Sequence, residues 1–341
     1  MASIVVMTPN PAIDVTYRVD TQLIGETNRV REIGRAPGGK GVNVARALAA
    51  LGRSSASVLP LGGTPGEWMR RAIAALPLNA HVTEVAGDTR STVTVTAPDS
   101  HPTVYSEAGP VITTAEWDAL RASLARALDT AASDGPGALV ISGSLPPGSS
   151  PDLIATWVSD ARSRGLLTVA DVSGDALLAA ARAGADVVKP NLHELLEATG
   201  AGDLDSGCRG LLALGAKLVV ISRGELGLVA RDANQEYSAP AVDLATFRRD
   251  GDGDGATTFN PTGAGDAATA ALTAALLDGA SVPEALRWAA ALGAAAVLRP
   301  RAGEVDIDAF STFMHRDENA VPGASASPLP HPAHQPAGAT P

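Results

Sequence analysis

The feature that most constrains this chain is a turn of small residues that leads directly into an apolar segment. Residues 260–266 read Asn-Pro-Thr-Gly-Ala-Gly-Asp, and Ala267 to Leu277 contain only Ala, Leu and Thr. The two glycines permit a sharp turn, and the composition of the next segment predicts a helix. The unpaired N–H groups and positive dipole end of that helix would face the turn, which suits a phosphate or a developing phosphoryl charge.

Asp266 stands at the start of this predicted helix, beside the anion site. A carboxylate in that position can take a proton from an attacking hydroxyl group. It can equally well do no more than cap the helix or balance its dipole. The choice between a base and a cap depends on the partners that the rest of the chain supplies.

Composition and charge narrow the class of protein. The 341 residues, 45% of them hydrophobic, can bury a large core in one or two domains. A net charge of −11 argues against non-specific nucleic-acid binding, although a local cationic pocket could still accept a phosphorylated substrate. Cys208 is the only cysteine, which excludes an intrachain disulfide. With no signal-peptide pattern and no apolar run of ~18 residues, we expect a cytoplasmic protein without nucleic-acid or membrane partners.

The first predicted strand places a carboxylate at one edge of the sheet. Ser3 to Thr8 predicts a short strand that ends in proline-rich residues, and Asp14 follows it. Open α/β sheets bind ligands beyond the carboxyl ends of their strands, so Asp14 is a candidate ligand-binding residue. A turn-forming role for its side chain is the alternative.

A second glycine-rich segment spans residues 37–43 and leads into a predicted helix over Val44 to Leu51. Its three glycines permit a ligand to approach the backbone closely. Lys40 adds a cation, and Asn43 adds both a donor and an acceptor. The spacing is not that of a Walker A loop, and an ordinary strand-to-helix turn is the alternative.

From residue 138 onward, strand and helix signals alternate, which predicts a mostly parallel sheet with helices on both faces. Four successive predicted strands end in polar loops rich in Gly, Ser or Asn: Leu139 to Ser142, Leu167 to Ala170, Asp186 to Val188 and Leu218 to Ile221. Because the carboxyl ends of parallel strands meet at one edge of a sheet, we expect the functional site there.

Two further polar features each permit two interpretations. Asn191 and Glu194 begin the predicted helix Leu192 to Thr199 and could hold a hydrated Mg²⁺ together with substrate phosphates. They also match a capping box. Arg90 precedes a predicted hairpin, Thr92 to Ala97 and Thr103 to Ser106, and its planar guanidinium group either binds an anion or is solvated.

Several of these segments, in this order along the chain, resemble the motifs of one family. They are residues 8–14 (Thr-Pro-Asn-Pro-Ala-Ile-Asp), 38–45 (Gly-Gly-Lys-Gly-Val-Asn-Val-Ala), 142–148 (Ser-Gly-Ser-Leu-Pro-Pro-Gly), 189–194 (Lys-Pro-Asn-x-x-Glu), 222–227 (Ser-x-Gly-x-x-Gly) and 262–266 (Thr-Gly-Ala-Gly-Asp). Over about residues 3–317 the chain resembles the PfkB/ribokinase carbohydrate kinases, in particular the phosphosugar branch with the 1-phosphofructokinases and tagatose-6-phosphate kinases. Motifs in a shared order are far more specific than any one of them.

The resemblance implies a fold and its domains. We expect a ribokinase-like three-layer α/β/α domain over residues 1–318, with a mostly parallel central sheet and a small β-sheet lid from residues 12–36 and 90–107. Residues 319–341 are rich in proline and lack periodicity, which predicts a disordered tail. The polar, glycine-rich residues 247–255 would form a mobile flap beside the nucleotide.

The resemblance also implies a role for each motif residue. Asp266 would be the catalytic base, and the amides of Gly263, Ala264 and Gly265 would form the anion hole. The phosphosugar would be bound by Asp14, Gly39, Lys40, Asn43, Arg90 and Ser144, with Lys40 and Arg90 chiefly facing its phosphate. ATP would be bound by Lys189, Asn191, Ser222, Gly224 and Gly227, and Glu194 would hold Mg²⁺ through water.

Three positions depart from the family pattern. Arg223 stands where the family usually has Leu, and Ala267 stands where Ser is common after the base. Asn260-Pro261 replaces a common Ser-Thr or Asp-Thr, so we expect a stiffer approach to the anion hole.

We therefore expect ATP- and Mg²⁺-dependent phosphorylation of a ketohexose phosphate to the bisphosphate. Gly-Gly-Lys-Gly is typical of the 1-phosphofructokinase branch and favours D-fructose 1-phosphate, which would give fructose 1,6-bisphosphate. Glu107 to Pro110 also resembles the tagatose-6-phosphate kinases, so tagatose 6-phosphate and fructose 6-phosphate stay open as acceptors. A catalytically silent sugar-phosphate-binding regulator is the alternative of another class. Lid-to-lid homodimers are common in the family, so a homodimer is possible here.

Overall fold

The computed structural model describes residues 4–98, 102–244 and 260–318 of the chain. The expected flap at residues 247–255 and the expected tail at residues 319–341 lie outside these ranges. Among the helices within them, none combines the length and the hydropathy needed to cross a bilayer.

Within the described residues, nine strands form one sheet in the order β13-β12-β11-β10-β9-β8-β1-β4-β5. Their bounds are β1 (Ile4–Met7), β4 (Ser55–Gly62), β5 (Asn79–Val85), β8 (Ala138–Ser142), β9 (Leu167–Asp171), β10 (Val187–Val188), β11 (Leu218–Ser222), β12 (Leu228–Arg231) and β13 (Glu236–Ala239). From β5 to β11 all neighbours are parallel, whereas β12 and β13 pair antiparallel at one edge. The predicted mostly parallel sheet is thus confirmed.

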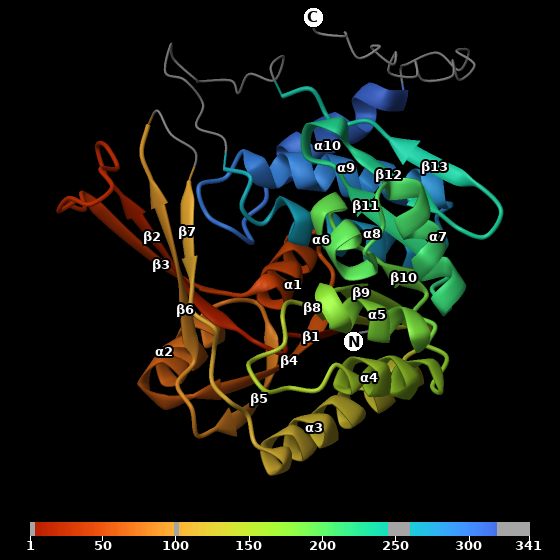
Figure 1. Cartoon of the computed structure of the whole chain (residues 1–341), viewed down its shortest axis with the longest axis horizontal. Helices are drawn as coiled ribbons and strands as arrows, with labels where there is room; N and C mark the ends of the chain where they lie inside the picture. The colour runs from red at the N-terminus through yellow and green to blue at the C-terminus, as the bar shows by residue number, and fades with distance from the viewer. Residues whose placement is uncertain (1–3, 99–101, 245–259, 319–341) are drawn as a thin grey trace, which may run out of the picture.

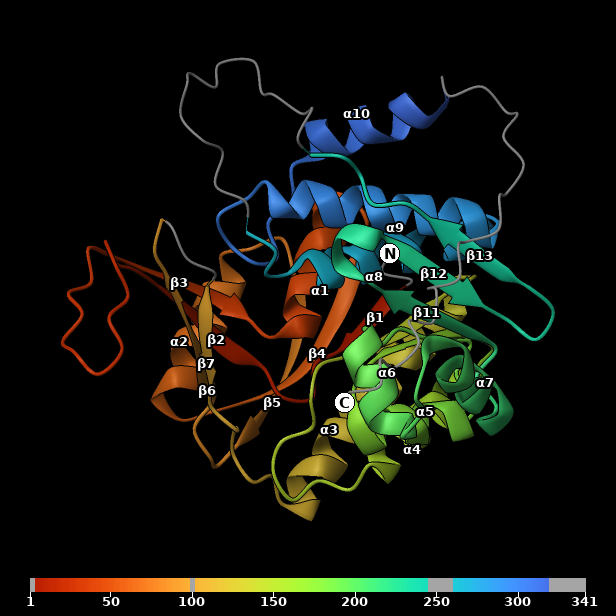
Figure 2. The same cartoon turned by 45° about the horizontal axis from the view of Figure 1, so that its top comes forward.

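Helices cover both faces of this sheet (Figure 1, Figure 2). One layer contains α3 (Thr114–Ser133), α4 (Asp152–Arg162), α5 (Gly174–Arg182), α6 (Leu192–Thr199) and α7 (Leu204–Leu214). The other contains α1 (Lys40–Ala50), α2 (Gly63–Ala74), α8 (Ala264–Leu277), α9 (Val282–Val297) and α10 (Ile307–Glu318). Strand β1 is buried on both sides, because Val5 and Met7 belong to one core and Ile4 and Val6 to the other. The predicted three layers are confirmed.

A second sheet of four strands lies beside the first, in the order β3-β2-β6-β7 (Figure 1). Its strands are β2 (Ala12–Arg18), β3 (Glu32–Gly38), β6 (Arg90–Thr96) and β7 (Thr103–Ser106). Strand β2 runs antiparallel to β3 and parallel to β6, and β6 and β7 form the predicted hairpin. The segments expected to form a small sheet do form one.

Helices α1 and α8 and strand β6 begin two to four residues before the predicted helices and strand, and the chain also turns back after β11. Helix α1 begins at Lys40 rather than at Val44, because Gly39 adopts φ 91° and turns the chain into the helix at once. After β11, a 3₁₀ turn over Gly224–Leu226 and Gly227 at φ 80° reverse the chain, which makes β12 antiparallel. The glycines could be read from the sequence, but the direction that the backbone takes after each of them could not.

Candidate active site

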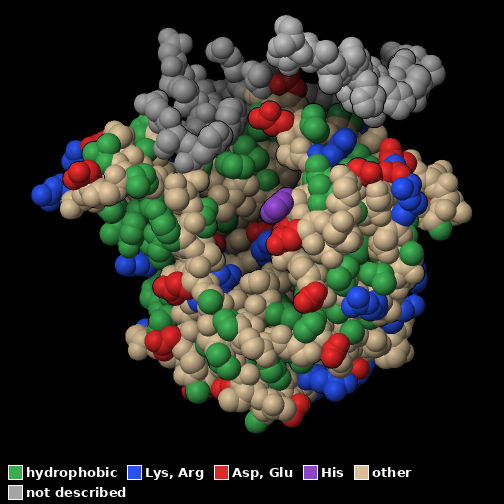
Figure 3. All heavy atoms as spheres, in the orientation of Figure 1, with side chains coloured by type: hydrophobic (Ala, Val, Ile, Leu, Met, Phe, Trp, Pro, Cys, Tyr) green, Lys and Arg blue, Asp and Glu red, His purple; other side chains and the backbone are tan. Residues whose placement is uncertain are grey.

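The carboxyl ends of the parallel strands and the N-termini of α1 and α8 meet at one edge of the main sheet. Ser142 and Asp171 lie in register at the ends of β8 and β9. Asn191 and Ser222 form a parallel bridge beyond the ends of β10 and β11. Figure 3 shows the surface hollowed between the small sheet and the main body, with acidic and basic side chains in the hollow. The four strand ends that the sequence predicts at one edge therefore do lie together.

The turn before α8 depends on its glycines. Gly263 adopts φ 87° as the N-cap, and a Cβ there would lie 3.0 Å from Ala302 Cα. The N–H group of Ala264 donates within the turn to Pro261 O at 3.2 Å. At Gly265 a Cβ would have no neighbour nearer than Lys189 Nζ, at 3.9 Å, so this backbone is open to a ligand. The Lys189 ammonium group thus lies close to the N-terminus of α8.

Asn260 anchors the same turn at its other end. Its Oδ1 accepts the Thr262 N–H at 3.0 Å, and its Nδ2 donates to Pro300 O at 2.9 Å. Its own N–H group donates to Val297 O at 2.9 Å. These bonds tie the approach to α8 to the end of α9, in line with the stiffness expected from Asn260-Pro261.

Asp266 lies in the first turn of α8 and is 7% exposed. Its carboxylate does not cap the helix; Oδ2 accepts a hydrogen bond from Asn43 Nδ2 at 2.9 Å. Burial raises the pKa of Asp266 to about 7, the charge of Asp171 adds to this, and Asn43 and Lys40 oppose it. A carboxylate that gains and loses its proton near neutral pH suits a general base.

Asp171 is the central residue that sequence reasoning missed. It is buried at the end of β9, with Lys40 Nζ 3.3 Å from Oδ1 and Lys189 Nζ 3.0 Å from Oδ2. Thr269 Oγ1 also donates to Oδ2, at 2.7 Å. Burial alone would raise the pKa of Asp171, but Lys189 and Lys40 lower it to about 2. Its place at the end of a predicted strand was the one signal in the sequence.

Glu194 forms the capping box that its motif predicts. Asn191 Oδ1 accepts the Glu194 N–H at 2.8 Å and Glu194 Oε2 accepts the Asn191 N–H at 2.9 Å, which is a capping box. The other oxygen, Oε1, lies 3.4 Å from Lys40 Nζ. The charge of Asp171, with help from Glu194, raises the pKa of Lys40 although burial opposes it. Oε2 is thus used by the capping box, and Oε1 pairs with Lys40.

Asp14 lies on β2 beside the N-terminus of α1. A side chain at Gly38 would collide with its carboxylate, so glycine at that position makes room for Asp14. Burial raises the pKa of Asp14 to about 6, although Arg90 and Arg46 lower it. At neutral pH Asp14 is mostly ionised and can accept hydrogen bonds from hydroxyl groups.

Arg90 is held by the small sheet and its surroundings. Its Nε donates to Asn10 O at 3.2 Å, and its Nη1 donates to Ser106 Oγ at 2.6 Å and to Glu107 O at 3.0 Å. None of these bonds uses Nη2. Asn10 Nδ2 reaches Ser144 Oγ at 3.4 Å, while Asn10 Oδ1 is buried without a partner among the described residues. Unused polar atoms of this kind suit a polyhydroxylated ligand.

The turn after β11 is shaped by Gly224 at φ 56° and Gly227 at φ 80°. A side chain at Gly227 would collide with the Ala239 carbonyl oxygen, whereas nothing lies within 4 Å of a Cβ at Gly224. Ser222 connects this turn to Asn191 through the bridge between β10 and β11. Arg223 Nη2 donates to Leu226 O at 3.4 Å, so the guanidinium group folds over the turn.

Solved structures share this fold. Phosphofructokinase-2 from Escherichia coli superimposes with a TM-score of 0.80 and 27% identity, covering 94% of this chain and 100% of that one. Ribokinase from Arabidopsis thaliana superimposes with a TM-score of 0.68 over 92% and 99% of the two chains; at 19% identity this likeness concerns the fold alone. The molecule is therefore a ribokinase-like α/β protein.

The sequence comparisons narrow this class to a family. A model of the pfkB family carbohydrate kinases matches residues 7–308. The chain belongs to the pfkB family of carbohydrate kinases. A curated relative, tagatose-6-phosphate kinase from Staphylococcus epidermidis, is 25% identical over 323 residues, covering 92% of this chain and 98% of its own. The Escherichia coli phosphofructokinase-2 has also been solved with fructose 6-phosphate and as a tetrameric inhibited form.

Proposed function

We propose that this chain transfers the γ-phosphoryl group of ATP to a hydroxyl group of a ketohexose phosphate. The observation that carries this proposal is Asp266, a buried carboxylate with a pKa near 7 in the first turn of a helix whose N-terminus is open at Gly265. A capping residue would direct its carboxylate to the backbone N–H groups, whereas Asp266 bonds Asn43. A base beside an anion-stabilising helix end is what phosphoryl transfer to an alcohol requires.

In this proposal, Asp266 takes the proton of the attacking hydroxyl group as its oxygen bonds to the γ-phosphorus. The bond to the β-phosphate oxygen breaks, and ADP leaves. The amides of Gly263 and Gly265 and Lys189 Nζ stabilise the charge on the transferred group, and the Ala264 amide joins them by exchanging its bond to Pro261 O for one to the phosphoryl group. These residues position the two substrates and neutralise the charge of the phosphates, and they form no covalent intermediate.

The charges of the site support a requirement for Mg²⁺. Lys40 and Lys189 face the three carboxylates of Asp171, Asp266 and Glu194, so these groups alone are not cationic enough to hold a polyanionic nucleotide. Glu194 Oε1, which lies outside the capping box and pairs with Lys40 in this structure, is a hard oxygen ligand at this edge. Mg²⁺ is commonly held by one or two carboxylates together with phosphates, directly or through water. Bound there, it would neutralise phosphate charge.

The remaining motif residues divide between the two substrates. We assign the sugar hydroxyls to Asp14, Asn43 and Ser144, and the sugar phosphate to Lys40 and to Nη2 of Arg90, with the backbone of Gly39 beside them. We assign the nucleotide to Lys189, Asn191, Ser222, Gly224 and Gly227. In this assignment Lys40 would turn from its carboxylate partners toward the sugar phosphate, and two cations on one dianion would favour a phosphorylated acceptor over a free sugar.

D-Fructose 1-phosphate is the acceptor that we propose first, because the Gly-Gly-Lys-Gly segment at residues 38–41 is typical of that branch. The relatives support two competitors. One is named tagatose-6-phosphate kinase, and phosphofructokinase-2 has been solved with fructose 6-phosphate. Each of these reactions would give a ketohexose bisphosphate.

Release of ADP with Mg-ATP should depend strongly on the acceptor. We expect one of fructose 1-phosphate, fructose 6-phosphate and tagatose 6-phosphate to exceed fructose by at least about a hundredfold in kcat/KM, because lost charge-assisted bonds cost about 3 kcal/mol in total. A coupled ADP assay measures this. Preference for free sugars would contradict the phosphate roles of Lys40 and Arg90. Tight binding of a phosphosugar without turnover would instead favour a silent regulator.

We further propose that the four-stranded sheet acts as a lid over the acceptor and as the interface of a homodimer in the cytoplasm. It carries exposed apolar side chains, including Ile33, Val104 and Tyr105, each more than half exposed. Such side chains on one small sheet favour association. Light scattering after size-exclusion chromatography should give a dimer, and Ile33→Glu should shift it toward monomer, whereas a monomeric parent protein would contradict the proposal.

A further inference from the structure

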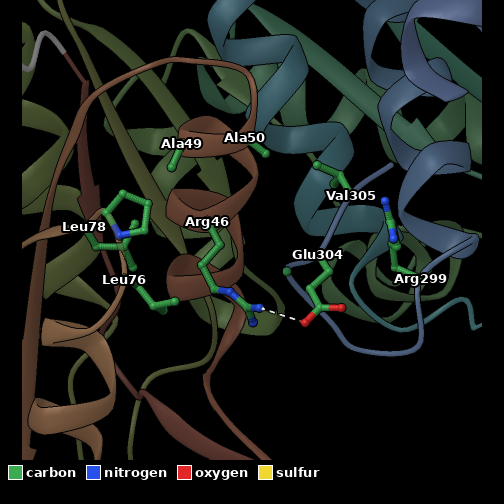
Figure 4. A pocket seen from close by; sticks show the side chains of 10 residues that line it. Arg46, Ala49, Ala50, Leu76, Leu78, Arg299, Glu304 and Val305 are labelled. Carbon is green, nitrogen blue, oxygen red and sulfur yellow. Dashed lines mark ion pairs between the residues drawn. The ribbon is translucent and has the colours of Figure 1, made fainter. Parts of the chain in front are cut away.

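A pocket of about 360 Å³ lies next to the active site and outside its motifs (Figure 4). Its walls come from the end of α1, the connection between α2 and β5, and the connection between α9 and α10. This volume is within the range of small-molecule sites. No residue assigned to the acceptor or to ATP lines it, so the proposed reaction leaves the pocket without a role.

The lining combines apolar surface with an excess of positive charge. Ala50, Leu76, Leu78 and Val305 supply the apolar part. Figure 4 shows Arg46 and Glu304 as an ion pair, with Nη2 3.6 Å from Oε1, and Arg299 on the same side. The nearest further partners are Arg301 with Glu304, at 3.8 Å, and Asp306 with Arg299, at 3.5 Å. In the lining itself, Arg46 and Arg299 face the single carboxylate of Glu304, and the charge of Asp14 acts on Arg46 from outside the pocket.

Arg299 also has hydrogen-bond donors to offer. Its side chain is 41% exposed, so the outer nitrogens of its guanidinium group can meet an anion in the pocket. A monoanion places less negative charge beside Glu304 than a phosphate dianion would. A carboxylate also fits the planar guanidinium group.

The pocket is connected to the anion hole by direct contacts. Arg46 Nη1 donates to Ala302 O at 2.7 Å, which fixes the connection between α9 and α10. Gly263 packs against this connection so closely that a Cβ there would lie 3.0 Å from Ala302 Cα. Gly303, which lines the pocket, lies against Asn43, where a Cβ would be 2.8 Å from Oδ1. Asn43 in turn bonds Asp266.

We propose that this pocket binds a small monocarboxylate with an apolar body, and that Arg46 couples its occupancy to the anion hole. The carboxylate competes with Glu304 for Arg46 and accepts from the outer nitrogens of Arg299, while the apolar body covers Leu76, Leu78 and Val305. Because Arg46 holds the segment against which Gly263 packs, a bound ligand alters turnover without touching either substrate. This effect on turnover rests on the proposed function; the binding itself does not.

Isothermal titration calorimetry with hexanoate, hexanamide and inorganic phosphate tests the site. We expect saturable binding of hexanoate, at least about tenfold weaker binding of the neutral hexanamide, and weaker binding of phosphate. Arg299→Gln should weaken hexanoate binding about tenfold. Ala50→Phe, which fills the rim without removing a charge, should weaken it as well. Arg53→Gln is the matched control, since Arg53 ends the same helix region and pairs with Asp278 outside the pocket, and should change nothing.

Three results would overturn the proposal. The first is an absence of saturable hexanoate binding, and the second is equal hexanoate binding by Arg299→Gln and the parent protein. The third is a preference for phosphate over hexanoate. If hexanoate binds but leaves ADP release with the best acceptor unchanged, the coupling through Arg46 is wrong. Calorimetry needs no turnover, so failure of every acceptor would refute the proposed function and leave the binding result standing.

Discussion

Asp266→Asn should lower kcat about a thousandfold with the best acceptor, the size of effect that a lost general base produces. Asn can still accept the hydrogen bond from Asn43 Nδ2, so the geometry of the α8 N-terminus should persist. What is lost is the group that takes the proton from the attacking hydroxyl. Single-turnover formation of ADP measures the chemical step directly, and the KM for ATP should stay within about threefold, since Asp266 is not assigned to the nucleotide.

The stability of this variant distinguishes a base from a cap. The folded-state pKa of Asp266, about 7, is above that of an exposed Asp, so ionised Asp266 destabilises the fold. That loss of stability begins as pH rises above about 4 and is complete above pH ~7. At pH 8, Asp266→Asn should therefore melt no lower than the parent protein. Asp278→Asn, at the exposed other end of α8, is the matched control and should keep kcat. Retained turnover in Asp266→Asn would refute the base.

Asp171→Asn should destabilise the fold and move the pH dependence of catalysis. Lys40 and Lys189 lose their shared counter-charge, and an unpaired buried ammonium group costs about 3 kcal/mol of unfolding free energy at neutral pH. The pKa of Asp171, lowered to about 2, means that the parent protein has this stability above pH ~4 and loses it as pH falls toward 2. Urea unfolding at pH 7 measures the difference.

The same variant should shift the acidic limb of kcat/KM to lower pH. In the parent protein this limb should have its midpoint near pH 7, because Asp266 must be ionised to accept a proton. The Asp171 charge helps to raise the pKa of Asp266, and its removal also leaves the full field of both lysines on the base. Asp186→Asn breaks an ion pair with Lys217 at the opposite end of β10, so it should cost stability without moving the limb. The same acidic midpoint of kcat/KM in the parent protein and both variants would contradict the effect of Asp171 on the pKa of Asp266.

Much of the fold and of the candidate site could be predicted from residues that are neighbours in the sequence. The helix after Gly263, the parallel strands from residue 138 and the Asn191–Glu194 cap each follow from residues adjacent in the sequence. The hydrogen bond between Asn43 and Asp266 could not be read in this way, because it joins two helices 223 residues apart. The role of Asp171 was hidden for the same reason: its three partners come from α1, from the end of β10 and from α8.

Separation along the chain also explains why the contacts of Arg46 next to the anion hole were not predicted. Arg46 lies in a helix whose sequence shows only an ordinary amphipathic pattern, and its partners follow α9. Strands β12 and β13 pair antiparallel because the glycine turn after β11 reverses the chain. The amino-acid composition of the turn does not encode that direction. In each case the missing information is a long-range contact rather than a local propensity.

The separation of Asn43 from Asp266 has a consequence for synthesis on the ribosome. The central strand β1 is made first, but its neighbours β4 and β8 emerge later, and the helix that carries the base emerges near the end of the described chain. At about 5–20 residues per second, the 223 residues between the two partners take on the order of ten to forty-five seconds to translate. While the later strands are being made, α1 is the helix that covers the α8–α9 side of the growing sheet, so the chain should depend on chaperones until α9 has emerged.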